Sequence, residues 1–256
     1  MIVENGRIVD LLLTIVFGIV VYYYIEQARK GKYRELRRLS ALDGIEEGVK
    51  RAVEMGSPIQ MTTGMGGFGA ETMAGLAVLS HLSKLCAQHG AKLIVSVLGA
   101  TKIPVTEAVV QGGYEDAGKP EEYAIGKQVR WLSNDQFAWA AGMIGIIERE
   151  HVAAQVLIGQ FMAEALIIVE AGMRRGALQV AGTAFIPDIP FFIVSCDHVL
   201  ITEEIFAAGA YLSQDPLQIG SISGQDAIRL ILIVIAGIGT LAAATGSKLI
   251  VDLLGL

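Results

Sequence analysis

The chain has 256 residues, of which 53% are hydrophobic and 18% charged, and its formal net charge is −6. Charged residues make up about a quarter of an ordinary soluble domain, so this composition excludes disorder and is too apolar for a plain soluble enzyme. The acidic balance argues against a nucleic-acid partner, which needs clustered Lys and Arg. The two cysteines, Cys86 and Cys196, cannot make a disulfide framework. We therefore expect a membrane protein or a tightly assembled oligomer.

The first apolar stretch runs from Leu11 to Ile25 without a charged residue. A helix of about 18 residues spans about 27 Å, close to the thickness of a thin hydrocarbon core. The stretch lacks the basic start and small-residue cleavage site of a secretory signal, and the tyrosines at 22–24 suit a membrane interface. Residues 1–28 are therefore predicted to form an uncleaved transmembrane anchor, with a buried core helix as the alternative.

A group of cations follows this anchor, at Arg29, Lys30, Lys32, Arg34, Arg37 and Arg38. Cations beside a membrane segment stay on the cytoplasmic side, so we expect the amino terminus outside and the following residues inside, at the cytoplasmic or inner membrane. The same cations could contact anionic lipid headgroups, and a solvated flank is the alternative interpretation.

A second uncharged stretch extends from Leu230 to Ser247. We predict that residues 226–256 form a carboxyl-terminal transmembrane segment and a short apolar tail. Small residues recur there at every fourth position, at Ala236, Thr240 and Ala244. This spacing lets helix backbones approach closely in lipid, and it predicts helix pairing within one subunit or between subunits.

Residues 29–225 alternate short apolar runs with longer helical patterns, and they are predicted to form one cytoplasmic domain. Strand runs without polar alternation, separated by helices, are typical of a mostly parallel sheet that is covered on both faces. The fold class is therefore α/β, a Rossmann-like doubly wound arrangement. Strands are expected at 59–63, 92–98, 128–132, 155–159, 178–182 and 191–196, helices at 42–55, 70–88, 135–149, 161–174 and 202–213, and an exposed polar loop at 112–123.

The most specific motif is a G-x-G-x-x-G pattern between a predicted strand and a predicted helix: Gly64-Met65-Gly66-Gly67-Phe68-Gly69. In dinucleotide-binding proteins such glycines let the pyrophosphate approach the backbone and the helix amino terminus. The second strand ends at 98–102 without the acidic residue that would bind the ribose, although Lys102 could face a phosphate. The alternatives are a dinucleotide, another small anionic ligand, or a turn that only serves packing. The candidate binding residues are Thr63, Gly64, Gly66, Gly67, Gly69 and Thr101, and no cofactor is identified.

Polar residues also follow other strand runs, at Gln160, Thr183 and the tetrapeptide 195–198, where ligands bind in open α/β sheets. Adjacent side chains at a strand end point in different directions, so Cys196 is interpreted as a buried strand residue and Asp197 as a cap for the helix near 202 or for a turn before it. Glu164 and Glu170 do not share a helix face, and Glu170 is placed to pair with Arg174. We assign no catalytic residue and no metal site.

The anchor, the basic flank, the segment 39–47, the turn at 64–69 and the closing apolar segment resemble an uncharacterised family of bacterial and archaeal membrane proteins, known only as a domain of unknown function. This resemblance covers nearly the whole chain. It implies no catalytic residue.

Charged residues stay sparse between 128 and 213, and the segment 137–144 is apolar on nearly every side. Our first hypothesis is therefore a membrane-anchored homo-oligomer with a structural or scaffolding role, whose partners are copies of itself and membrane lipid. The first alternative is a membrane-tethered domain, either a binding module or an enzyme, that binds a nucleotide or a small anionic ligand at Gly64–Gly69. The second is an auxiliary subunit of a transporter.

Overall fold

The computed structural model describes residues 8–33 and 39–244, which form two compact units. Of the described residues, the helical unit combines 8–33 with 214–244, and the α/β unit comprises 39–213. The boundary expected at 225/226 falls inside a helix, α9, which begins at Pro216. The cations Arg34, Arg37 and Arg38 and the predicted apolar tail at 249–256 lie outside the described residues.

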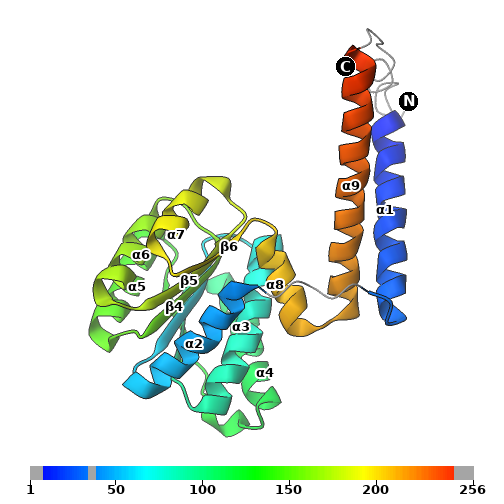
Figure 1. Ribbon diagram of the computed structural model, residues 1–256. Coiled ribbons are helices and arrows are strands. Elements are labelled where there is room, and N and C mark those ends of the chain that lie inside the picture. The colour runs from blue at the N-terminus through cyan, green and yellow to red at the C-terminus, as the bar shows by residue number, and fades with distance from the viewer. Residues whose placement is uncertain (1–7, 34–38, 245–256) are drawn as a thin grey trace. The chain divides into compact units, whose positions relative to one another are not determined.

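The helical unit is an antiparallel pair formed by the first and last helices, α1 (Ile8–Arg29) and α9 (Pro216–Ala244) (Figure 1). Its spans Leu11–Arg29 and Pro216–Leu241 are long and apolar enough to cross a membrane, and most of their side chains are exposed.

Two glycines set the distance between these helices. A Cβ on Gly220 would lie 2.6 Å from the Cα of Ile25, and one on Gly224 would lie 2.9 Å from the Cα of Val21. Glycines four residues apart thus let the two backbones touch, as small residues do in membrane helices. The stripe that the sequence singled out is not at this contact, because Ala236 and Thr240 are exposed.

The α/β unit contains a six-stranded sheet in which every neighbouring pair is parallel, in the order β3-β2-β1-β4-β5-β6. The strand order reverses between β1 and β4, as in the doubly wound dinucleotide-binding fold, so the predicted fold class is confirmed. The strands are β1 (Ile59–Gly64), β2 (Leu93–Leu98), β3 (Val129–Ser133), β4 (Ala154–Gln160), β5 (Leu178–Thr183) and β6 (His198–Ile201).

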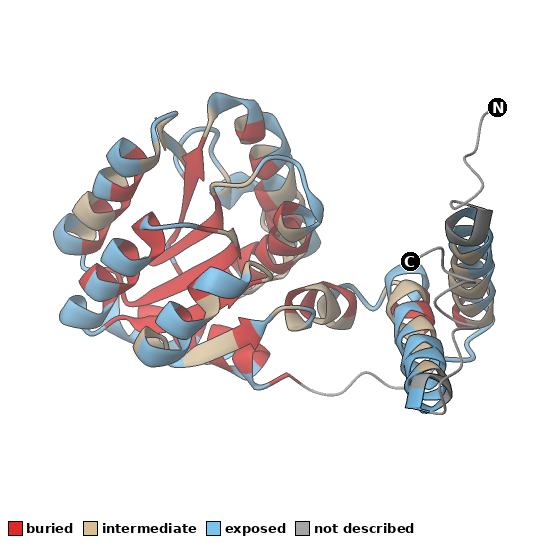
Figure 2. Ribbon diagram, turned by 90° about the horizontal axis from the view of Figure 1, so that it is seen from above, coloured by how far each residue is buried: buried red, intermediate tan, exposed pale blue. Residues whose placement is uncertain are grey.

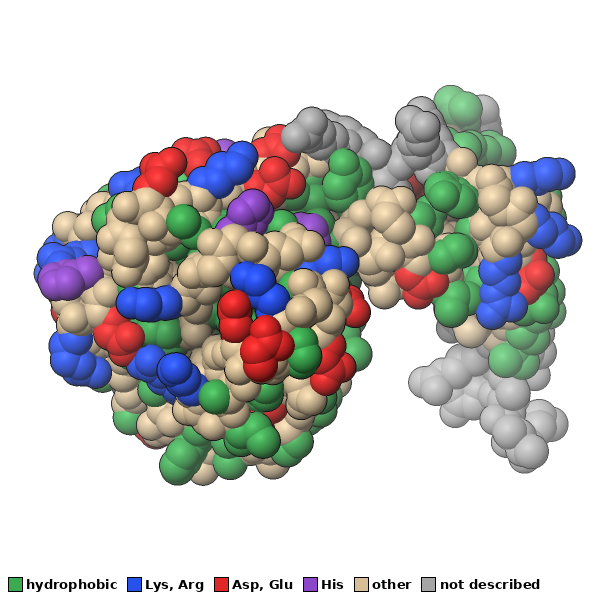
Figure 3. All heavy atoms as spheres, turned by 90° about the horizontal axis from the view of Figure 1, so that it is seen from below, with side chains coloured by type: hydrophobic (Ala, Val, Ile, Leu, Met, Phe, Trp, Pro, Cys, Tyr) green, Lys and Arg blue, Asp and Glu red, His purple; other side chains and the backbone are tan. Residues whose placement is uncertain are grey.

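Helices cover both faces of this sheet (Figure 1). One face carries α2 (Ser40–Met55), α3 (Ala70–His89), α4 (Ile103–Asp116) and α8 (Glu204–Ser213), and the other carries α5 (Gln136–Glu150), α6 (Glu164–Arg175) and α7 (Ile189–Ser195). Buried residues concentrate along the strands and the inner helix faces (Figure 2). Acidic and basic side chains are intermingled on the face of the α/β unit that Figure 3 shows, with hydrophobic side chains between them.

Two expectations for local structure are wrong. The predicted strand at 191–196 is the helix α7, and the last strand begins at His198. The segment has aromatic and β-branched residues, which are common in strands, but Pro190 lies in the first turn of α7, a position that favours the start of a helix. The predicted loop at 112–123 is helical as far as Asp116, because α4 also starts with a proline in its first turn and packs closely on α3 at Gly113.

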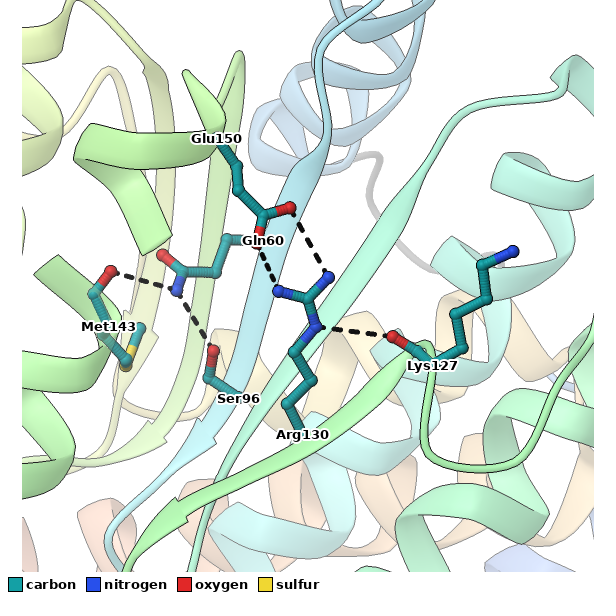
Figure 4. Close-up of polar contacts among 6 residues, drawn as sticks. All are labelled: Gln60, Ser96, Lys127, Arg130, Met143 and Glu150. Atoms are coloured by element: carbon teal, nitrogen blue, oxygen red, sulfur yellow. Dashed lines mark hydrogen bonds and ion pairs between the residues drawn. The ribbon is translucent and has the colours of Figure 1, made fainter. Parts of the chain in front are cut away.

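A row of buried polar side chains crosses the middle of the sheet, and Figure 4 shows the part of it formed by Gln60 and Ser96. Gln155 Nε2 donates to Gln60 Oε1 at 3.0 Å, and Gln60 Nε2 donates to Ser96 Oγ at 3.1 Å and to the Met143 carbonyl at 3.4 Å. Gln179 stands opposite Gln155 in the next strand. A slip of one residue would turn these amides to the other face, so the row fixes the register of the strands.

Candidate functional site

The glycine turn, residues 64–69, lies at the carboxyl end of β1, where the strand order reverses. The backbones of β1 and β4 approach too closely there for side chains. A Cβ on Gly64 (φ +70°) would lie 2.2 Å from the Gln160 carbonyl oxygen, and a Cβ on Gly159 (φ +148°) would lie 2.2 Å from that of Thr63. The first glycine of the motif is therefore required by packing, and so is Gly159, whose role the sequence did not reveal.

The remaining glycines of the turn differ in their surroundings. A Cβ on Gly66 would lie 2.9 Å from Gln160 Oε1, whereas Gly67 and Gly69 have open space at that position. Thr72 Oγ1 donates to the Gly67 carbonyl at 2.6 Å. The N-cap position of α3 is occupied by Gly69, which has no side chain to cap the helix. The open side of the turn is thus formed by Gly67, Gly69 and the first turn of α3.

Thr63 and Thr101, the two threonines predicted to bind a ligand together with these glycines, do not line the open side of the turn. Thr63 is buried beneath the turn, where a Cβ on Gly75 would lie 3.2 Å from its Cγ2. Thr101 is exposed in the 3₁₀ segment η2 (Ala100–Lys102). The structure therefore does not bring Thr63 or Thr101 to the open side of the turn.

Lys102 forms hydrogen bonds with the backbone of the glycine turn. Its Nζ donates to the carbonyl oxygens of Gly64 at 2.7 Å and Gly66 at 3.1 Å, and the side chain is buried. Within the described part of the chain it forms no ion pair with a carboxylate, and burial lowers its pKa to about 8. Lys102 therefore ties η2, the segment that follows β2, to the glycine turn.

A cavity of about 390 Å³ opens beside the glycine turn, and Lys102 is not among the residues that line it. Its volume lies within the range of small-molecule sites. It is lined by Gly67, Phe68, Gly69, Ala70, Glu71, Thr72, Gln160 and Phe206. Glu71 is the single ionisable side chain of this lining, and its Oε2 lies 3.5 Å from the backbone nitrogen of Ala184, just after β5.

Two further carboxylates belong to the same edge of the sheet. Glu164, at the start of α6, is fully buried and accepts hydrogen bonds from Gln136 Nε2 and from the Met162 backbone nitrogen. Asp188 is 2% exposed, and its Oδ2 has no hydrogen-bond partner in the described residues. Burial, followed by the charges of Glu164 and Glu71, raises the pKa of Asp188 to about 6. The sequence did not indicate a role for Asp188, because it predicts a strand at 191–196, where the structure has the helix α7.

The candidates at 195–198 form no catalytic arrangement. Cys196 lies at the end of α7, and burial raises its thiol pKa to about 12, so the nucleophilic thiolate is disfavoured. Asp197 Oδ2 accepts from the Gln179 backbone nitrogen at 2.7 Å, so its expected role as a helix or turn cap is wrong. The ring of His198 packs against Gly44.

The predicted pairing of Glu170 with Arg174 is confirmed at 3.9 Å. Over residues 8–33 and 39–244, no three His, Cys, Asp or Glu side chains are grouped closely enough to hold a metal ion. This edge of the sheet therefore combines a cavity, which has the carboxylate of Glu71 in its wall, with the two buried carboxylates of Glu164 and Asp188. Lys102 is hydrogen-bonded to the glycine turn at the same edge.

A parallel sheet in this strand order, with a glycine turn where the order reverses, defines a Rossmann-like α/β protein, here with two helices of membrane-spanning length. The chain belongs to the family described as a domain of unknown function, DUF6754, whose model matches residues 1–254. No curated protein and no solved structure matches the chain.

Proposed function

We propose that the chain is a membrane-tethered α/β protein that binds a small ligand in the cavity beside the glycine turn. The observation that carries this proposal is the position of the cavity, at the point where the strand order reverses, which is where open α/β sheets bind ligands. Two ionisable groups of the same edge, Lys102 and Asp188, have pKa values moved toward neutrality, as is common near functional sites.

In this proposal α1 and α9 cross the membrane, and the α/β unit lies on the cytoplasmic side with the amino terminus outside. The support for this orientation is the basic flank that begins with Arg29, Lys30 and Lys32. Anionic headgroups are the lipid contact that these cations suit. Protease protection of sealed vesicles would test the orientation, which predicts that the α/β unit is digested only from the cytoplasmic face.

Gly67 offers the sharpest test of the cavity, because it lines the cavity and a Cβ there meets open space. We expect Gly67→Leu in the full chain to abolish ligand-induced thermal stabilisation while the melting temperature of the free protein stays close to that of the wild type. Gly112→Leu on α4 is the matched control, since Gly112 also faces open space and is not in the cavity wall. An equal response of both variants to every ligand would contradict the proposal.

A second candidate function is self-assembly at the membrane through α7 and the residues around it. The observation that favours it is an exposed apolar surface: Ile186 is 72% exposed, Ile193 54% and Val194 83%. Apolar surface of this kind is typical of contacts between proteins. In this candidate the assembled copies have a structural or scaffolding role.

Light scattering of the full chain in detergent at micromolar concentration tests this second candidate. Val194→Glu should reduce the mass to that of a single chain, whereas Ile125→Glu, at a residue that is 80% exposed on another surface, should leave the oligomer intact. A wild-type chain that runs as a monomer would contradict it.

A further inference from the structure

We propose that the cavity beside the glycine turn takes an organic cation, such as an alkylammonium group, rather than an anion. This inference rests on the proposed function and specifies the class of its ligand. Its first support is the charge of the wall: Glu71 is ionisable, and neither Lys nor Arg is among the lining residues. The ammonium of Lys102 is directed to the carbonyls of Gly64 and Gly66 and is not part of the wall.

The buried carboxylates add to this negative field. Asp188 is nearly inaccessible and has an Oδ2 without a hydrogen-bond partner in the described residues, and it interacts electrostatically with both Glu164 and Glu71. A buried carboxylate oxygen without a partner is costly, and neighbouring carboxylates increase that cost. A cation beside Glu71 would offset the charge of Glu71 and so reduce its repulsion of Asp188.

Aromatic rings provide the second kind of contact that a cation prefers. Phe68 and Phe206 both line the cavity, and Phe68 is 55% exposed. In the part of the chain that the structure describes, neither ring is stacked on another aromatic ring. An alkylammonium group binds the face of such a ring through its quadrupole, and the contact is strongest when the cation is desolvated.

A helix amino terminus such as that of α3, whose N-cap residue is Gly69, attracts anions in general. Glu71 lies in the first turn of that helix, however, and its own carboxylate already complements the partial positive charge there. An incoming anion would also have to approach this carboxylate. The carboxylate in the cavity wall therefore favours a cation, while the ammonium of Lys102 is bonded to the carbonyls of Gly64 and Gly66.

The test measures thermal shifts and calorimetric binding for the full chain in nanodiscs, with tetraethylammonium and n-butylammonium as cationic probes. Inorganic phosphate and ATP are the anionic probes, and sodium chloride of equal ionic strength is the blank. We expect saturable binding of at least one cation, and Glu71→Gln and Phe68→Ala should each weaken it about tenfold. Glu121→Gln, at an exposed glutamate outside the cavity wall, is the control and should bind normally.

The possible outcomes separate this inference from the proposed function. Binding of phosphate or ATP without either cation, lost in Gly67→Leu, would overturn the cation inference and leave the cavity as a ligand site. Cation binding that Glu71→Gln does not weaken would also overturn the inference. Binding of no probe would overturn the inference, whereas the proposed function is tested separately by Gly67→Leu with a broader set of ligands.

Discussion

The ammonium group of Lys102 lies 2.7 Å from the carbonyl oxygen of Gly64, a residue 38 positions earlier in the chain. A second hydrogen bond, to Gly66, makes this lysine a clamp that joins the end of β2 to the glycine turn. The cavity beside the turn is lined by Gly67 and Gly69 and not by Lys102.

Removal of the clamp should destabilise the fold. Lys102→Met leaves two carbonyl oxygens without their donor, and we expect the free energy of unfolding to fall by about 1–3 kcal/mol. Denaturant melts of the full chain in detergent would measure this, with Lys92→Met at an exposed lysine as the control. Equal stability of the two variants would show that the clamp contributes nothing.

The same lysine should give the protein a characteristic alkaline response. Burial lowers its pKa from 10.5 in the unfolded chain to about 8, so the folded state binds fewer protons between these values. The contribution of Lys102 to stability therefore rises with pH from about 8 to 10.5. The difference in melting temperature between wild type and Lys102→Met should change across this range, and a constant difference would refute the assigned cause.

Asp188 should give the opposite response in acid. Its pKa is raised from 3.8 to about 6, so the folded state holds the proton more tightly and stability falls as pH rises through this interval. Asp188→Asn removes the titration and should be more stable than the wild type at pH 7.5, with a smaller advantage at pH 4.5. Melting temperatures at both pH values measure the effect, and an Asn variant that is less stable at pH 7.5 would argue against an unpaired carboxylate.

Gly159 should tolerate no side chain. In Gly159→Ala the new Cβ would meet the Thr63 carbonyl oxygen in a backbone conformation that L residues rarely adopt, and we expect a loss of at least about 2 kcal/mol. Gly67→Ala, at a position with open space, should cost less than about 1 kcal/mol. A comparable loss in both variants would contradict the close approach of β1 and β4.

The close contact between α1 and α9 should depend on the missing side chain of Gly220. Gly220→Leu would push against the backbone of Ile25, whereas Gly237→Leu on the same helix meets open space. Spin labels at the exposed positions Ile19 and Leu230 would report the separation of α1 and α9. We expect a longer and broader distance distribution for Gly220→Leu alone, and unchanged distributions in both variants would argue against this contact.

The sequence predicted β1, β2, β4 and β5 well because each is a short apolar run between helical patterns, with a wholly or largely buried strand as the result. It also located β3, although only Val129 of that strand is buried. It failed at α7, whose aromatic and β-branched residues also suit a strand. The helix is stabilised there by long-range packing, since the rings of Phe192 and Phe161 meet edge to face at 5.5 Å.

The position of the candidate site was predictable, but its chemistry was not. The glycine spacing located the turn, because the motif has a local backbone meaning. The relation of Glu71 to Asp188 depends instead on which strands are neighbours, and Lys102 reaches the turn only because β2 lies beside β1. Such contacts arise from the sheet order, which no local pattern specifies.

Native mass spectrometry of the full chain, released from nanodiscs after incubation with a library of organic cations, phosphates and nucleotides, tests the cavity most directly. We predict at least one bound small molecule on the wild type and on Gly112→Leu, and none on Gly67→Leu. The same bound molecule on all three proteins, or no bound molecule on any of them, would contradict a ligand site beside the glycine turn.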